Sequence, residues 1–116
     1  MHWVVESLLE EPSYIEKPMF GCKGCYLHGR LVLVLAARGK DPWNDLLVPT
    51  ERKYHQSMRR DHKNLAIHPV LKKWPYLSES NEDFEESARA LVEAILANDP
   101  RTGVEPKLNP RRSRRS

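Results

Sequence analysis

The sequence predicts an α+β domain in which a small antiparallel sheet packs with three helices. Two apolar runs, 19–27 and 30–38, flank His28-Gly29, and a two-residue turn containing glycine between apolar runs is typical of a β-hairpin. Apolar residues also recur at helical spacing from 84 to 95. The chain has 116 residues, enough for one domain of ordinary size.

The first expected element is a short helix over residues 2–11, ended by Pro12, and its apolar stripe consists of Val4, Val5, Leu8 and Leu9. In a regular hairpin the numbers of paired residues sum to 57, so Cys25 pairs with Val32 and Cys22 with Leu35. Alternation then predicts one apolar face toward the helices, made of Phe20, Cys22, Tyr26, Leu31, Leu33, Leu35 and Ala37. We therefore expect Cys22 to be buried and Cys25 to point to the opposite, partly wet face.

Prolines and helix-capping residues predict the remaining elements. Residues 45–48 form a short third strand that Pro49 ends, and Thr50 is placed to cap a helix over about 51–62. Residues 74–77 could supply an edge strand, because prolines interrupt the extended segment 65–77. The last helix closes at 98–100, and residues 80–83 resemble a capping box in front of it.

The charge is divided unevenly along the chain. Residues 99–116 hold six basic and two acidic side chains, whereas residues 1–98 hold 13 basic and 14 acidic ones. The end of the chain has three prolines and almost no large apolar residues, so it cannot bury enough surface to order itself. We expect a folded domain over 1–98 and a disordered basic tail over 99–116. Deleting residues 101–116 should then leave the melting temperature almost unchanged.

Composition excludes several classes of protein. The longest apolar run, 31–37, has seven residues, far below the roughly 18 needed to cross a bilayer. Early acidic residues and the lack of a basic segment argue against a signal peptide. Two cysteines are too few for a secreted disulfide framework. We expect a soluble, cytoplasmic protein with no membrane partner.

The segment from Lys17 to Arg30 resembles the opening of the TfoX N-terminal domain, whose pattern is Arg-Met-Phe-Gly-Gly-x-Gly followed by a hairpin turn. Cys22 stands where that family has a second glycine, and the residues that fit are Met19, Phe20, Gly21, Gly24, Tyr26 and Gly29. The order of elements fits over roughly residues 2–97. TfoX regulates natural competence, and some members of the related YjbR/MmcQ group have been proposed to bind DNA. The resemblance implies an α+β fold and a regulatory role, and supplies no catalytic residue.

Cys22 and Cys25 form a C-x-x-C motif, and with His28 they are the candidate metal ligands. A spacing of three along a regular strand sends the two thiols to opposite faces, and a structural zinc needs four well-placed ligands. The motif is better explained as two small side chains on a strand than as a metal site. The chain has no G-x-S-x-G, P-loop or G-x-G-x-x-G motif, so we expect neither an enzyme nor a cofactor.

Basic residues are the strongest functional signal. Residues 52–73 hold seven basic side chains against Asp61 alone. On one helix, Arg52, Arg59 and Lys63 would lie within about 40° of one another. The candidate contacts to nucleic acid, electrostatic and independent of base sequence, are Arg52, Arg59, Arg60, Lys63, Arg111, Arg112, Arg114 and Arg115.

Two alternatives remain open. The basic residues could form only a solvated face that keeps the domain soluble. The chain could instead be a protein-interaction module or a homodimer, with Trp43, Trp74 and Tyr76 at its surface and an edge strand near Trp74 as the route to a dimer. The salt dependence of binding distinguishes these interpretations, because binding to phosphates weakens steeply as salt is added.

Overall fold

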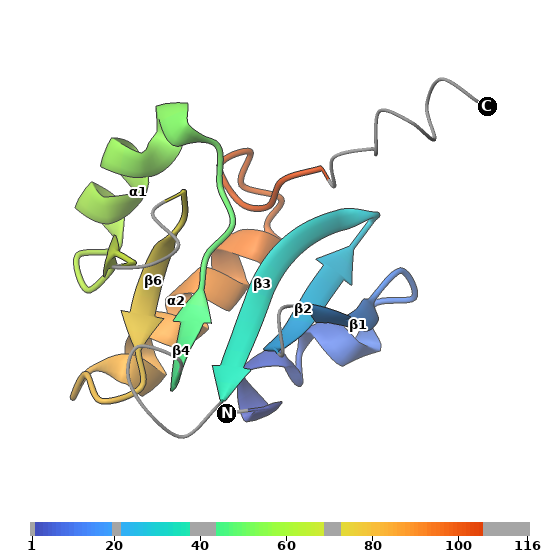
Figure 1. The fold of residues 1–116 in the computed structure, drawn as a ribbon. Coiled ribbons are helices and arrows are strands. Elements are labelled where there is room, and N and C mark those ends of the chain that lie inside the picture. The colour runs from blue at the N-terminus through green and yellow to red at the C-terminus, as the bar shows by residue number, and fades with distance from the viewer. Residues whose placement is uncertain (1, 20–21, 38–43, 69–72, 106–116) are drawn as a thin grey trace.

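The computed structural model describes residues 2–19, 22–37, 44–68 and 73–105 and has the expected α+β class (Figure 1). All strands pair antiparallel in one six-stranded sheet of order β1-β2-β3-β4-β6-β5. The strands are β1 (Ile15–Met19), β2 (Cys22–Leu27), β3 (Arg30–Ala37), β4 (Asn44–Leu47), β5 (Ala66–Ile67) and β6 (Pro75–Ser78). Within the described ranges, every helix is too short or too polar to span a membrane.

Among the described residues there are two α-helices rather than the expected three. They are α1 (His55–Asp61) and α2 (Phe84–Leu96), accompanied by the 3-10 turns η1 (His2–Val5), η2 (Leu8–Glu10) and η3 (Arg52–Tyr54). The expected helix over 2–11 is therefore wrong: the segment forms two 3-10 turns. With three residues per turn, Val5 and Leu8 share a side and are fully buried, whereas Leu9 rotates away and is 50% exposed.

The hairpin is confirmed, but its register is not regular. His28 and Gly29 form the turn with φ of 53° and 76°, as a two-residue hairpin turn with positive φ requires. Tyr26 pairs with Leu31 as expected, whereas Cys25 pairs with Leu33. Val32 is thus an extra residue on β3, a β-bulge that one sequence cannot reveal by alternation alone.

The bulge reverses the expected faces of β2. Cys25 is fully buried in the main core, while Cys22 lies beside the smaller cluster on the other face. The expectation that Cys22 is the buried thiol is therefore wrong. The two thiols do lie on opposite faces and are not joined in a disulfide. On β3, Leu33 and Leu35 face the main core as predicted, and the bulged Val32 joins them.

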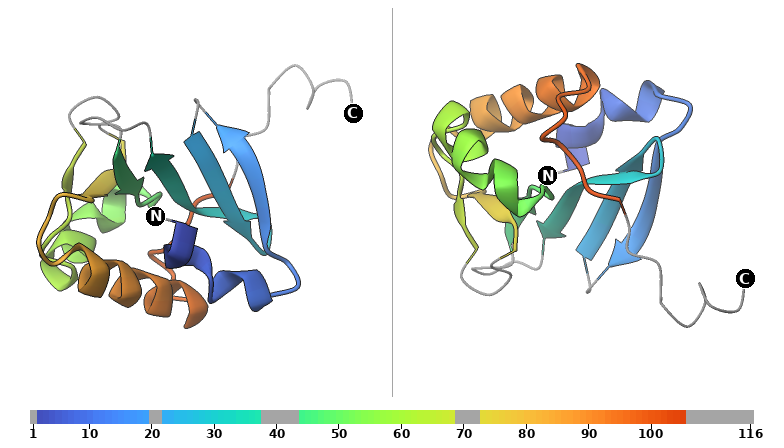
Figure 2. Two further views of the ribbon diagram at one scale, coloured as in Figure 1. Left: turned by 90° about the horizontal axis from the view of Figure 1, so that it is seen from below. Right: turned by 90° about the horizontal axis from the view of Figure 1, so that it is seen from above.

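Both faces of the central strands are buried. α2 and the N-terminal turns cover one face, as the two views of Figure 2 show, and they enclose the main core with β3, β4 and β6. The second face was expected to be partly wet, but it carries a separate apolar cluster of Leu31, Val34, Leu47 and Trp74. Because Trp74 is buried and β5 covers the outer side of β6, the expected edge strand near Trp74 is an internal strand.

Two residues expected to cap helices form other hydrogen bonds. The side chain of Thr50 is buried, and its hydroxyl donates a hydrogen bond to the carbonyl of Arg101 (2.6 Å). The N-cap of the turn that follows is Glu51, which forms no side-chain cap bond. The N-cap of α2 is Asp83, with no side-chain cap bond, and Ser80 instead lies 2.8 Å from Ser78 between their hydroxyl oxygens. The apolar stripe of α2 is confirmed, with Phe84, Ala88, Leu91, Val92 and Ile95 all buried.

A left-handed residue ends α2 and turns the chain back. Asn98 has φ 60°, its N–H donates to the carbonyl of Ile95, and the N–H of Asp99 donates to that of Ala94. This pair of bonds is the Schellman arrangement, for which asparagine is the usual alternative to glycine. The turn directs the following residues toward the start of β3.

Residues 99–105 are part of the folded domain, so the expected boundary at residue 98 is too early. Leu31 and Val104 exchange two backbone hydrogen bonds (2.9 and 3.0 Å), and Arg30 donates to the carbonyl of Gly103 (2.8 Å). Thr102 and Gly103 are buried. This segment lacks large apolar residues but orders through backbone pairing, which composition does not register. Residues 106–116 lie outside the described residues.

The first prediction concerns this segment. A chain that ends at Asn98 should melt about 10 °C or more below the full chain, because several net hydrogen bonds of about 1 kcal/mol each are removed. A chain that ends at Glu105 keeps all of these bonds and is the matched control. Differential scanning calorimetry of the three chains checks this. Equal melting temperatures for the two shortened chains would contradict the docking described.

The second prediction compares two glycines with similar backbone angles. Gly29 (φ 76°) has open space where a Cβ would stand, whereas a Cβ at Gly103 (φ 81°) would lie 3.1 Å from Val32 Cγ1. Gly29→Ala should cost about 1–2 kcal/mol, the strain of a left-handed residue. Gly103→Ala should cost more, since it adds the clash. Urea unfolding of both variants measures the difference, and equal costs would contradict it.

Candidate nucleic-acid interface

The basic residues of the segment 52–63 lie on two successive elements and on the turn after them, not on one helix. Arg52 is on η3, Arg59 and Arg60 are on α1, and Lys63 follows the helix end. The prediction of a single helical face over 51–62 is therefore wrong, because the segment begins as a 3-10 turn and α1 ends at Asp61. All four side chains are nevertheless exposed.

Packing explains why this segment turns its charges outward. Pro49 follows β4, and the short helix α1 buries Met58 completely while Tyr54 packs against the main core. Met58 is the one fully buried side chain of α1, and Gln56, Arg59, Arg60 and Asp61 are exposed. Arg59 and Arg60 occupy the last turn, where positive charge complements the helix dipole.

The basic side chains of this segment differ in whether a carboxylate lies beside them. Arg60 lies 3.7 Å from Asp61, from Nε to Oδ1. Among the described residues, no carboxylate forms an ion pair with Arg52, Arg59 or Lys63. We call the exposed side chains of Arg52, Lys53, Arg59, Arg60 and Lys63 the basic surface.

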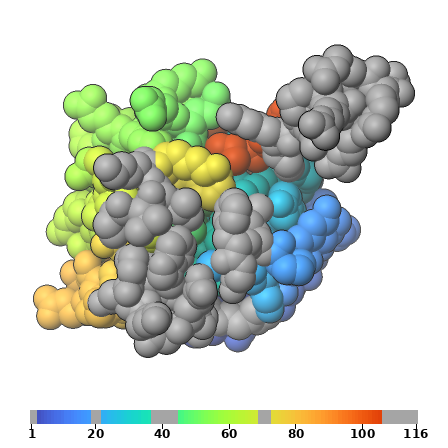
Figure 3. Space-filling model, viewed as in Figure 1, coloured from blue at the N-terminus to red at the C-terminus, as the bar shows by residue number. Residues whose placement is uncertain are grey.

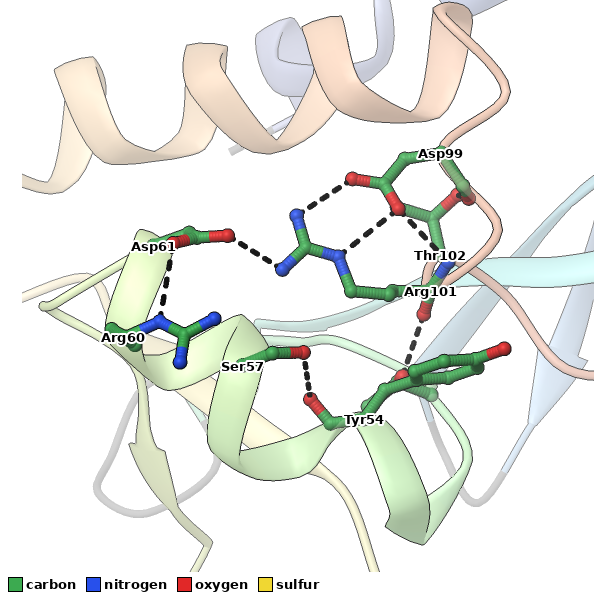
Figure 4. A network of polar contacts seen from close by, with 8 residues as sticks. Tyr54, Ser57, Arg60, Asp61, Asp99, Arg101 and Thr102 are labelled. Atoms are coloured by element: carbon green, nitrogen blue, oxygen red, sulfur yellow. Dashed lines mark hydrogen bonds and ion pairs between the residues drawn. The ribbon is translucent and has the colours of Figure 1, made fainter.

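Arg101 joins α1 to the end of the folded domain (Figure 4). Its Nη1 donates to Asp61 Oδ2 (2.7 Å), while Nε and Nη2 donate to the two carboxylate oxygens of Asp99 (3.1 and 2.8 Å). Paired hydrogen bonds of this kind are among the stronger charge-assisted contacts. The guanidinium therefore fixes the segment after α2 against the C-terminal end of α1, and Figure 3 shows both at the same end of the molecule.

This pairing sets the protonation of its members. The hydrogen bond from Arg101 lowers the pKa of both Asp61 and Asp99 below the usual range for aspartate, and the two carboxylates raise the pKa of Arg101. Burial, and then the charge of Arg101, lower the pKa of His62. All three charges of the pairing are therefore present at neutral pH, and His62 adds little positive charge there.

The opposite charge gathers on another element. The exposed side of α2 and the turn before it carry an open hollow lined by Glu82, Asp83, Glu85, Glu86, Arg89, Ala90 and Glu93. Glu85 and Arg89 form an i,i+4 ion pair at 2.8 Å. Acidic side chains thus predominate on α2 and basic side chains on η3 and α1, so the electrostatic field differs between these two sides of the domain.

The other sequence candidates are dispersed. Cys25 is buried in the main core, where burial raises the pKa of its thiol to about 11, and Cys22 lies on the other face of the sheet. His28 is in the hairpin turn, where its Nδ1 lies 3.2 Å from Ser13 Oγ. Over the described ranges, no three His, Cys, Asp or Glu side chains gather as metal ligands would. Arg111, Arg112, Arg114, Arg115 and Trp43 lie outside those ranges.

One buried polar pair was not anticipated from the sequence. Asp45 on β4 and His68 after β5 are both fully buried, with Oδ2 and Nε2 3.8 Å apart, and the His68 ring meets Tyr76 edge-on at 5.0 Å. The signal that could have found it was an aspartate at the start of an apolar strand. The pair links β4 to the segment after β5 on the second face of the sheet.

The third prediction follows from the lowered carboxylate pKa values. Asp61 and Asp99 stabilise the fold above their unfolded pKa of about 4, and that stability is lost as pH falls below it. Arg101→Gln removes the cause of the shift. The variant should therefore be less stable than the parent chain at pH 7, and the gap should shrink as the pH falls below about 4.

Urea unfolding of both chains across this pH range measures the gap. Lys17→Gln, a change of one exposed charge on β1 away from Asp61, is the control and should show no such convergence. A gap that stays constant from pH 7 to pH 3 would show that Arg101 stabilises the fold by packing rather than by its carboxylate partners.

Comparison with known proteins adds no relative from which a role could be transferred. No protein-family model matches the chain. Neither a curated protein nor a solved structure matches it. The likeness of residues 17–30 to TfoX N-terminal domains therefore stays a prediction, and the role of the chain has to be argued from its own residues.

Proposed function

We propose that the domain is a non-enzymatic binding module that contacts the phosphate backbone of nucleic acid through the basic surface and the Arg-rich end of the chain. The contact is electrostatic and independent of base sequence. A regulatory role of this kind agrees with the resemblance to TfoX N-terminal domains.

One observation carries the proposal. The hydrogen bond between Arg101 and Asp61 holds residue 101 against α1, and the described chain ends four residues later at Glu105, whose carboxylate lies 3.9 Å from Arg30. Residues 111–115 then have a covalent reach of roughly 20–35 Å from Glu105. Both sets of arginines can meet one phosphate backbone, and a tethered second set binds at high effective concentration.

The charge pattern supports a single orientation of binding. The basic surface is exposed and largely free of partner carboxylates among the described residues. The acidic side of α2 repels phosphate, so an approaching duplex is turned toward α1. Arginine and lysine side chains that contact phosphates position a protein on nucleic acid without reading its bases.

The fourth prediction tests the basic surface with a labelled random-sequence duplex. Replacing Arg52, Arg59 and Lys63 by Gln should weaken binding and reduce the slope of log K against log salt by about 0.9 for each phosphate that the protein no longer neutralises. Fluorescence anisotropy between 50 and 200 mM salt measures both quantities. The chain that ends at Glu105 shows the share contributed by residues 106–116.

A matched variant controls for net charge. Lys17, Lys23 and Arg89 are exposed and lie on β1, β2 and α2, where Lys23 and Arg89 form ion pairs with Glu16 and Glu85. Their replacement by Gln removes the same amount of positive charge elsewhere on the domain. This control should keep most of the slope. Equal reductions in the two triple variants, or no binding at 50 mM salt, would overturn the proposal. Self-association that persists in high salt would favour the protein-interaction alternative.

A further inference from the structure

Asp61 is an obstacle to the proposed use of the basic surface. It is the only carboxylate in residues 52–73, and its side chain is 48% exposed at the end of α1. One oxygen faces Arg60 and the other accepts the hydrogen bond from Arg101. A free carboxylate here would repel phosphate and hold Arg60 in an internal ion pair.

We propose that Arg101 is a positioning residue that makes α1 usable as a phosphate-binding face, because it neutralises Asp61 from outside the basic surface. This inference rests on the proposed function and assigns a role to a residue that the sequence placed only in the tail. Arg101 acts through Asp61 and Arg60 and does not itself contact the nucleic acid.

The geometry supports this role over a direct contact. The Arg101 side chain is 20% exposed, and Nε, Nη1 and Nη2 each already donate to a carboxylate oxygen. Its backbone is held as well, since its carbonyl accepts from Thr50 and its N–H donates to Asp99 Oδ1. Reaching a phosphate would require breaking these bonds, whereas Arg59 and Lys63 are exposed without such partners among the described residues.

The charges around Asp61 give a measurable expectation. Arg60 already lies 3.7 Å from Asp61 while Arg101 is present. Without Arg101, Arg60 is the one cation among the described residues that forms an ion pair with Asp61, so Asp61 holds it more strongly and withdraws it from phosphate binding. The protein then neutralises one phosphate fewer, which reduces the salt slope by about 0.9 and raises Kd roughly tenfold at 50 mM salt. Asp61→Asn removes the competing carboxylate and should restore Arg60 to the nucleic acid even when Arg101 is absent.

The fifth prediction uses four proteins in the anisotropy experiment: the full chain, Arg101→Gln, Asp61→Asn and the double variant. Arg101→Gln should show the reduced slope, and the double variant should regain the slope of the full chain. Asp61→Asn alone should bind at least as tightly as the full chain. Arg101→Gln and the double variant both lack the ion pair between Arg101 and Asp99, so a comparison between them isolates the charge of Asp61.

The outcomes separate the inference from the function on which it depends. If Arg101 contacts phosphate directly, the slope stays reduced in the double variant and the inference is wrong while the function stands. An unchanged slope in Arg101→Gln would also overturn the inference alone. If the full chain does not bind at 50 mM salt, the function and the inference fail together. Thermal melts confirm that each variant is folded at the assay temperature.

Discussion

The start of β3 depends on a hydrogen-bond partner from the far end of the chain. Leu31 is buried, and β4 pairs with β3 only from Val34 onward. Because β4 does not reach Leu31, the N–H and the carbonyl of Leu31 would have no hydrogen-bond partner on the β4 side of β3. A buried backbone group without a partner is costly, and Val104 supplies both missing bonds. Three features bring Val104 beside Leu31: the Schellman turn at Asn98, the hydrogen bond from Arg30 to the carbonyl of Gly103, and the positive φ of Gly103.

The pairing of Val104 with Leu31 also determines where Arg101 lies on the surface. Arg101 lies three residues before Val104, so the segment that completes the sheet also places a guanidinium between α1 and the end of α2. The ion pairs of Arg101 thus connect a structural requirement of the sheet to the charge of α1. The segment that completes the sheet thus also determines which cation lies beside Asp61 at the end of α1.

The sequence was most informative where one local pattern decides the structure. The hairpin turn at His28-Gly29 and the apolar stripe of α2 were predicted because turn chemistry and helical spacing are local. The burial of Cys25 was missed, since an extra residue at Val32 shifts the register and leaves no trace in the alternation. The docking of residues 99–105 was missed because it rests on backbone bonds to Leu31, some seventy residues away. The exposure of Arg59 could be predicted, but its relation to Arg101 required the fold.

The distance along the chain between the two halves of this closure has a consequence for biosynthesis. Arg30 and Gly103 are 73 residues apart, so β3 leaves the ribosome long before the segment that completes it. Until then the backbone of Leu31 and the apolar side chains beside it are open to other chains, a state in which strands aggregate. Long-range closure of this kind also slows folding. Nascent chains of this protein are therefore expected to need protection until residues 99–105 have emerged, because most of the sheet exists before the segment that pairs with the start of β3.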